Sequence, residues 1–555
     1  MTLRRLYLYV VSAASLVVLA LGLVNLGATI LLFVFNDPNA QQNRTALAIY
    51  AAMSIVALPV WGVHFWFAQR FATRDPYERT SAIRHLYLYL ACLGFAVASM
   101  VNVAVTLGEA LRPVLDNQGM NAEMVAQGAW ATVVTVDILA IHFFIAVRDR
   151  QAVHEEGRSA TLRRWYMYTA LLVGLLTMLS FTQQLLMTAW TALVAATPTV
   201  TPDLAVPAGA ALAGALMWGF HARVIATQHI ADDRHSTLRA VEGFIAVAIS
   251  IISALFGASL VLYYAVARAL GVDSPGGASN DLLTAAAGPA SLFLVYGVAW
   301  FLLNRRLARD GASQEADRQA GVRRLYTNLV ALISLGAWAS GAVVLLGTLL
   351  AQVEGPIIGA RAPDWRDPIS LGATLVVVGA AVWLAHWRQS PWATDRQAFS
   401  RRLYVWAALL GSALAGLVAG VNLVYVVLQQ VFSANPRLDD PQNLGFARSL
   451  AVIVVGVGVA AYHWRVLRMD AAARPARPAP APKPAVVAAA SAASAASASS
   501  KDKPTQPAEV TGPHAHRYTL VVTDASEDDV HQALSSLPPQ AGYKLTPAEQ
   551  AVDGR

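Results

Sequence analysis

Long apolar segments alternate with short polar ones along most of the chain, and they recur in pairs. Each first segment exceeds the roughly 20 residues that cross a hydrocarbon core of about 30 Å. These first segments occupy residues 6–35, 86–107, 165–186, 245–266, 325–350 and 403–428. Their partners, which are about as long, occupy residues 46–67, 128–147, 208–225, 284–303, 371–387 and 450–467. Because a helix satisfies its own backbone in lipid, the pattern predicts an all-α, polytopic membrane protein with about twelve transmembrane helices.

A basic, aromatic signature opens each pair. Its first arginine recurs at steps of 80, 79, 76, 84 and 78 residues, at Arg4, Arg84, Arg163, Arg239, Arg323 and Arg401. A histidine near the end of each second segment, replaced by asparagine in the fourth pair, recurs with a similar period. These residues are His64, His142, His221, Asn304, His386 and His463. Together the two features predict six two-helix repeats, in which a short basic loop leads into the next repeat. Their approximate bounds are 1–78, 79–157, 158–234, 235–317, 318–395 and 396–470.

Composition and charge add an orientation. The chain is 56% hydrophobic and 14% charged, whereas soluble domains carry about 25% charged residues. Loops that join repeats hold 22 Arg, counting Arg223 in the last turn of its segment, and loops inside repeats hold seven. Since cytoplasmic loops retain positive charge, we expect both termini in the cytoplasm. Lysine is absent before Lys483, so we expect arginines to rest their stems on the apolar boundary and reach headgroups.

Two further features narrow the class of protein. The first apolar segment is too long for a secretory signal core, and its pattern repeats downstream, so we expect a retained first span. Cys92 is the only cysteine, which excludes an intrachain disulfide and a cluster of thiolate ligands.

The composition changes after the last apolar segment. Residues 471–513 are rich in Ala, Pro and Ser, which predicts a disordered, semi-extended linker. Residues 514–555 follow a strand, helix, strand pattern. This small cytoplasmic tail element is either a docking site for a cytoplasmic protein or a partly ordered tail.

The repeats resemble a known family. The residues that carry the resemblance are the Arg-Arg-Leu-Tyr-Leu-Tyr opening at 4–9, its variant at 84–89, and the Pro-Val-Trp-x-x-His-x-Trp ending at 59–66. They are similar to a family of uncharacterised bacterial multi-pass membrane proteins, the domain of unknown function 5671 (DUF5671). The resemblance covers about the first 470 residues and implies a bacterial cytoplasmic membrane and the topology above, but no activity. The fourth repeat matches least, because Glu242 replaces the tyrosine and Asn304 the histidine.

The repeated histidines have two interpretations. His64, His142, His221, His386 and His463 lie near the last turn of a span. Beside Trp, Tyr and Arg they fit interfacial anchors that hydrogen-bond to headgroups or neighbouring carbonyls. A ring of imidazoles that binds haem or a metal is the alternative. Membrane haem usually needs paired axial histidines inside the core, so we expect no cofactor and no metal.

Two acids fall within the spans. Asp137 lies near the middle of its segment, where an ionised carboxylate facing lipid costs several kcal/mol. It is a candidate for proton coupling, and helix packing is the alternative. Glu242 is the second candidate, and pairing with Arg239 at the interface is its simpler explanation.

Amides form a polar band 18 to 21 residues after the opening arginine of their repeats. At about 1.5 Å per residue they lie toward the outer leaflet. Interhelical hydrogen bonds of about 0.6 to 2 kcal/mol are one use, and a polar lining for a solute path is the other. The band consists of Asn25, Asn102, Gln183, Gln184 and Asn422.

Missing motifs narrow the function. The chain has no Gly-rich phosphate loop, His-Glu-x-x-His, Gly-x-Ser-x-Gly or paired Cys motif, so we do not expect an enzyme. The leading hypothesis is a membrane scaffold or sensor that presents residues 514–555 to a cytoplasmic protein. A small-solute or proton-coupled transporter with two parallel halves is the alternative. The expected partners are the lipid bilayer and a protein, not nucleic acid, and no oligomeric state is predicted.

The topology is testable with reporter fusions. Fusions after Asp75, Arg309 and the C-terminus should report cytoplasm, and fusions near Asn39 and Asp203 should report the opposite side, because arginine is concentrated in the loops between repeats. The opposite result at two sites contradicts the twelve-span topology.

Overall fold

The structure is a computed structural model. It describes residues 2–38, 43–152, 157–194, 203–227, 236–277, 281–311, 317–358, 363–387, 398–432 and 445–472. The chain divides into two units, Met1–Ala476 and Arg477–Arg555. The predicted tail element, and the predicted linker beyond residue 472, therefore lie outside the described residues.

All regular secondary structure in the described ranges is helical, without a strand. Twelve helices of this part of the chain are long and apolar enough to span a membrane, which confirms the predicted all-α class. The first helices of the units are α1 (Thr2–Val34), α4 (Ala82–Leu115), α6 (Gly157–Val194), α9 (Thr237–Ala269), α12 (Asp317–Ile358) and α15 (Phe399–Phe432). The second helices are α2 (Arg44–Arg74), α5 (Ala122–Ala152), α7 (Ala205–Thr227), α11 (Ala287–Gly311), α13 (Arg366–Trp387) and α16 (Gly445–Ala472). Three short elements connect them: α3 (Pro76–Arg79), η2 (Pro275–Gly277) and α10 (Leu282–Ala285).

The first helices begin earlier than the apolar pattern predicts. Helix α6 starts at Gly157 instead of Trp165, and α12 starts at Asp317 instead of Leu325. The basic signatures therefore lie inside helices, and the prediction of basic loops at these positions is wrong. Arginine is a good helix former, so the helix continues through the signature although the apolar run has ended.

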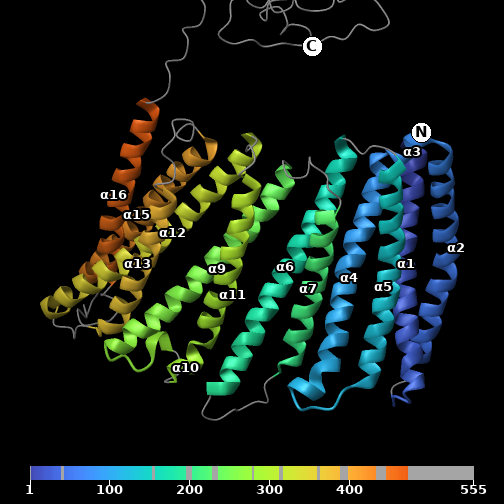
Figure 1. Ribbon diagram of the computed structural model, residues 1–555. Helices are drawn as coiled ribbons and strands as arrows, with labels where there is room; N and C mark the ends of the chain where they lie inside the picture. The colour runs from blue at the N-terminus through green and yellow to red at the C-terminus, as the bar shows by residue number, and fades with distance from the viewer. Residues whose placement is uncertain are drawn as a thin grey trace, which may run out of the picture. The chain divides into compact units, whose positions relative to one another are not determined.

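The two helices of each predicted unit pack against each other, and each unit also packs against the next. Contacts between α1 and α5, α4 and α7, α6 and α11, α9 and α13, and α12 and α16 join the units into a row, which Figure 1 shows from α2 at one edge to α16 at the other. The start of α1 and the end of α16 lie at opposite edges of this row but on the same side of it, the upper side in Figure 1.

Glycines allow the closest helix contacts. A Cβ atom on Gly209 of α7 would lie 2.4 Å from the backbone nitrogen of Gly108 on α4. On the other side of α7, a Cβ atom on Gly214 would lie 2.5 Å from the backbone nitrogen of Met178 on α6. Because glycine lets helix backbones approach closely, α7 fits between α4 and α6. More than half of its apolar window is buried as a result.

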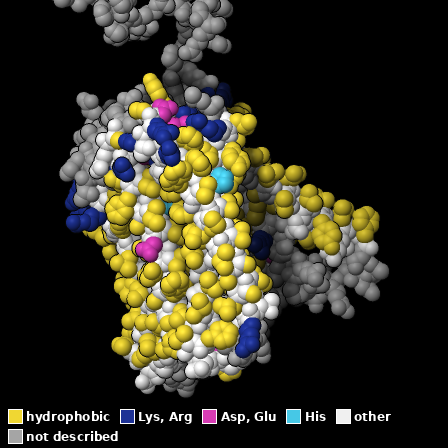
Figure 2. Space-filling model, turned by 90° about the vertical axis from the view of Figure 1, so that its right-hand side faces the viewer, with side chains coloured by type: hydrophobic (Ala, Val, Ile, Leu, Met, Phe, Trp, Pro, Cys, Tyr) yellow, Lys and Arg dark blue, Asp and Glu magenta, His cyan; other side chains and the backbone are white. Residues whose placement is uncertain are grey.

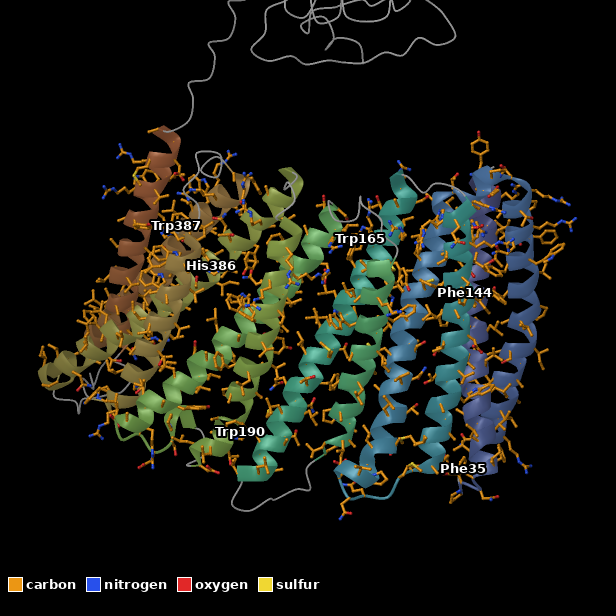
Figure 3. The ribbon with its side chains drawn as sticks, viewed as in Figure 1. Phe35, Phe144, Trp165, Trp190, His386 and Trp387 are labelled. Atoms are coloured by element: carbon orange, nitrogen blue, oxygen red, sulfur yellow. The ribbon has the colours of Figure 1, made fainter. Side chains whose placement is uncertain are left out.

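The outer surface is apolar over its middle and charged toward one end, as Figure 2 shows for one face. Large exposed hydrophobic side chains occur on most of the spanning helices, which suits contact with lipid. Figure 3 places Trp165, His386 and Trp387 toward one end of the helices and Phe35 and Trp190 toward the other. Aromatic rings at both ends are typical of the two membrane interfaces.

Candidate functional site: the tyrosine and histidine junctions

The two repeated features of the sequence, the basic, aromatic signature and the histidine near the end of each second helix, contact each other in the structure. The signature tyrosine of the first helix hydrogen-bonds to Nε2 of the histidine near the end of the second helix. The distances are 3.3 Å for Tyr7 and His64, 2.9 Å for Tyr87 and His142, 3.0 Å for Tyr166 and His221, and 2.9 Å for Tyr404 and His463. In the fifth unit the rings of Tyr326 and His386 lie edge to face, with centroids 6.0 Å apart. A tyrosine and histidine contact therefore joins the two helices in five of the six units.

The other ring nitrogen fixes the direction of these hydrogen bonds. In all five histidines Nδ1 lies 2.7 to 2.9 Å from the backbone carbonyl four residues earlier. A carbonyl only accepts hydrogen bonds, so Nδ1 carries the hydrogen. In the neutral ring Nε2 is then an acceptor, and the tyrosine hydroxyl donates to it.

Each of two tyrosines also accepts a hydrogen bond from the preceding unit. The indole N–H of Trp61 donates to the Tyr87 hydroxyl at 3.2 Å, and that of Trp383 donates to the Tyr404 hydroxyl at 2.8 Å. A third indole, that of Trp300, hydrogen-bonds to Tyr326. The chain of donors thus runs from a tryptophan of one unit through the tyrosine of the next to that unit's histidine. Hydrogen bonds in such a chain polarise and strengthen one another.

Aromatic rings enclose these two hydrogen-bonded chains. We call Trp61, Phe65, Tyr87 and His142 the first junction, and Trp383, Trp387, Tyr404 and His463 the second junction. Phe65 lies 6.1 Å from the Tyr87 ring, and Trp387 lies 4.8 Å from the Tyr404 ring. Both follow the histidine of their own unit by one residue and pack on the histidine of the next. The two junctions therefore share the same order of tryptophan, tyrosine and histidine at equivalent places, with Phe65 of the first replaced by Trp387 in the second.

A buried ion pair lies beside each junction. Nε of Arg84, which is 1% exposed, donates to Asp149 at 2.6 Å, and Nε of Arg401 donates to Asp470 at 2.7 Å. The Arg84 guanidinium also donates to the Tyr9 hydroxyl and to Gln69, both in the first unit. These arginines point inward and do not reach headgroups, contrary to our expectation for the signature. A burial this complete requires the acid, because an unpaired guanidinium in the interior is costly.

Sequence reasoning missed these acids, although a signal was present. Asp149 follows His142 by seven residues, and Asp470 follows His463 by the same interval. Seven residues are about two helical turns, so each acid lies on the same face as its histidine. The arginine and tyrosine of the signature are three residues apart and also share a face. When the two helices pack side by side, these equal-facing spacings predict that the arginine pairs with the acid and the tyrosine with the histidine.

The fourth unit uses different chemistry at the same place. Glu242, which stands where other units have tyrosine, is buried and forms an ion pair with Arg306 of α11 at 3.2 Å. Asn304, in place of the histidine, is exposed. Trp218 of the preceding unit is three residues before His221, as Trp61 is before His64, yet its indole N–H has no hydrogen-bond partner among the described residues. Loss of the tyrosine thus coincides with loss of the link from the preceding tryptophan.

The histidines differ in burial. His142, His221 and His463 are at most 1% exposed, so their polar contacts are to helices and not to headgroups. His64 and His386 are half-buried. Four of the Nε2 atoms engage a tyrosine and all five Nδ1 atoms engage a carbonyl, which leaves little capacity for a haem or metal ligand. Within the described ranges no three His, Cys, Asp or Glu side chains come together in a way that would hold a metal ion.

Asp137 faces outward. It lies at the middle of α5 and is exposed, next to the exposed Val133 and Val136. Among the described residues it has no hydrogen-bond or ion-pair partner, and it does not line the cavity between α12, α13, α15 and α16. This outward placement therefore argues against an interior proton path through Asp137.

The amides of the predicted polar band mostly bridge helices. Asn102 donates to Thr135 at 3.5 Å, Gln183 to Ser291 at 2.9 Å and Asn422 to Ser449 at 2.9 Å. Asn25 instead donates to the carbonyl of Leu21 on its own helix. These four side chains lie in different units and do not converge on one path.

These features define a multi-pass helical membrane protein that is held together by buried polar junctions. The model of the family described as a domain of unknown function (DUF5671) matches residues 5–136 and 324–447. The resemblance seen in the sequence is confirmed over these two segments, and the DUF5671 domain is repeated along the chain. The first match runs from α1 into α5 and the second from α12 through α15, so each copy contains one tryptophan-to-tyrosine link.

No curated protein and no solved structure matches this chain. The family description names no activity, so any function has to be argued from the geometry.

The first prediction from this geometry concerns the junction hydroxyls. Replacing Tyr87 or Tyr404 by Phe should lower the free energy of unfolding by about 1 to 2 kcal/mol, because an indole N–H and an imidazole nitrogen lose their partner in a buried site. Tyr425→Phe is the matched control, since this side chain is 59% exposed on α15. Thermal unfolding in detergent measures the difference. Equal midpoints for all three variants would contradict a structural role of the hydroxyls.

The second prediction concerns Asp137. Asp137→Leu should keep or raise thermal stability, because a carboxylate at the centre of a lipid-facing helix costs about 3 kcal/mol on insertion scales. Val136→Leu, at a neighbouring exposed position, controls for the added bulk. A lower midpoint for Asp137→Leu alone would reveal a partner that stabilises the carboxyl group.

Proposed function

We propose that this multi-pass membrane protein is a scaffold or sensor that presents its C-terminal residues 514–555 to a cytoplasmic protein. The observation that carries the proposal is the use of the repeated polar groups. The signature tyrosine and arginine contact the histidine and the acid of their own unit, and the tyrosine also contacts the tryptophan of the preceding unit. We infer that these groups serve helix packing instead of chemistry on a substrate. The repeated motif therefore favours a rigid platform over an enzyme.

The ends of the chain support the same proposal. The first helix begins and the last helix ends on the same side of the helix row, the upper side in Figure 1. The arginine distribution supports a cytoplasmic location for that side under the positive-inside rule. The 83 residues that follow Ala472 would then be available to a cytoplasmic partner.

A transporter is the weaker candidate. Its best intramembrane acid, Asp137, is exposed on α5, and the four amides do not converge. Proton coupling needs a titratable group on a path between the two sides. Neither feature supplies one within the described residues.

The proposal is testable by truncation after Ala472. In intact cells, crosslinking should capture the same cytoplasmic proteins with the full chain in every replicate and lose them with the truncated chain. A chain whose residues 514–555 are scrambled keeps tail length and composition and should also lose them. An unchanged size-exclusion profile of the truncated protein shows that the helices remain folded.

Two results would count against the scaffold proposal. One is capture of the same proteins by all three chains, since binding would then not require the tail. The other is a pH-gradient dissipation in vesicles that disappears in Asp137→Asn, which would favour the transporter.

A further inference from the structure

A second site lies next to the second junction, because Leu335, Ala408 and Val459 line it and belong to the same buried cluster as Tyr404. A cavity of about 810 Å³ opens between α12, α13, α15 and α16. It extends along α12 from Leu332 to Ala351, a rise of about 28 Å at 1.5 Å per residue. That length nearly equals the hydrocarbon thickness of a bilayer, and the volume is typical of ligand-binding cavities.

Small residues create this space. Ala408, Gly411, Ser412 and Ala415 lie on one face of α15 and line the cavity. A Cβ atom on Gly411, or on Gly336 across the cavity on α12, would meet no atom within 4 Å. The space is therefore not filled by neighbouring side chains.

The wall is apolar in its middle part. The hydroxyl of Ser412 donates to the carbonyl of Ala408, and that of Thr348 donates to the carbonyl of Val344. These groups are satisfied within their own helices, so a polar solute would find few partners there. The wall suits a hydrocarbon chain instead.

Charged side chains gather at one rim. Asp364 and Arg448 both line the cavity near the starts of α13 and α16. Both are exposed, and Arg448 has no ion-pair partner among the described residues. A third charged residue of the rim, Asp367, already accepts hydrogen bonds from Tyr263 and from the backbone of Gly276. Oδ1 of Asp364 accepts a hydrogen bond from the backbone N–H of Arg366 at 3.1 Å, which leaves Oδ2 for a ligand. The rim thus offers the Arg448 guanidinium and one carboxylate oxygen of Asp364 to a ligand.

We propose that this cavity holds an acyl chain of a phospholipid whose headgroup carries a primary ammonium, as in phosphatidylethanolamine. Arg448 binds the phosphate, because a guanidinium forms charge-assisted hydrogen bonds with phosphate oxygens. Asp364 binds the ammonium group. The rim charges match such a zwitterion better than an anionic lipid, which would leave the carboxylate unpaired. All the residues that line the cavity belong to the helical unit, so this proposal stands or falls independently of the scaffold proposal.

The test uses the purified full chain and native mass spectrometry with lipids of identical acyl chains. Phosphatidylethanolamine should bind more tightly than phosphatidylcholine, because a methylated ammonium cannot donate hydrogen bonds. It should also bind more tightly than phosphatidylglycerol, which has no ammonium group. Arg448→Gln should weaken phosphatidylethanolamine binding at least about tenfold, the loss expected for a charge-assisted hydrogen bond. Arg268→Gln, at an exposed arginine at the end of α9, is the control. Asp364→Asn should remove the preference over phosphatidylcholine.

Filling the cavity tests the acyl chain separately. Gly411→Phe should abolish retention of the lipid, and Gly336→Leu should do the same from the opposite wall. Gly416→Phe is the matched control, because it lies on the same helix, also has open space around its Cβ position and does not line the cavity. The size-exclusion profile checks that each variant is folded. Equal lipid retention by Gly411→Phe and Gly416→Phe, or equal binding of the three lipids by the parent, would overturn the proposal.

Discussion

Polar groups buried between apolar helices must find their partners inside the protein, and this constraint organises the whole structure. In lipid the hydrophobic effect does not drive helices together, so packing and interhelical hydrogen bonds decide which helices pair. The Tyr87 hydroxyl meets the constraint in two directions, toward His142 of its own unit and Trp61 of the preceding one. One phenol hydroxyl thus stabilises both the pairing of two helices within a unit and the packing of that unit against the preceding one.

The same arrangement of hydrogen-bonded side chains occurs twice, once around each DUF5671 copy. The second junction repeats the order of tryptophan, tyrosine and histidine around Tyr404, and an arginine with an acid seven residues after the histidine accompanies both. The tryptophan-to-tyrosine link therefore lies within both matched segments. Between the two copies, the fourth unit differs from this pattern, because Glu242 replaces the tyrosine and forms an ion pair with Arg306. The fourth unit thus uses an ion pair at the tyrosine position, whereas the third unit keeps the hydrogen bond between Tyr166 and His221.

Much of this fold could be predicted from the sequence, because apolar length and arginine distribution determine spans such as residues 6–35 without any tertiary information. The contact partners could be predicted only in part. The period of Tyr87 and His142 was readable, and so was the spacing of Asp149, but the link from Trp61 depends on which unit packs next. The outward face of Asp137 could not be read either. A span that is apolar on all sides carries no periodicity to say which side meets lipid.

The central claim is that a tryptophan and a tyrosine of adjacent units stabilise the fold through one hydrogen bond. A double-mutant cycle with Trp383→Phe and Tyr404→Phe measures this directly, because it isolates the coupling between the two side chains from their separate packing. The account predicts a coupling of about 0.6 to 1.7 kcal/mol, which lies between the average and the maximum measured for interhelical hydrogen bonds in a membrane protein. Additive effects of the two substitutions would contradict it.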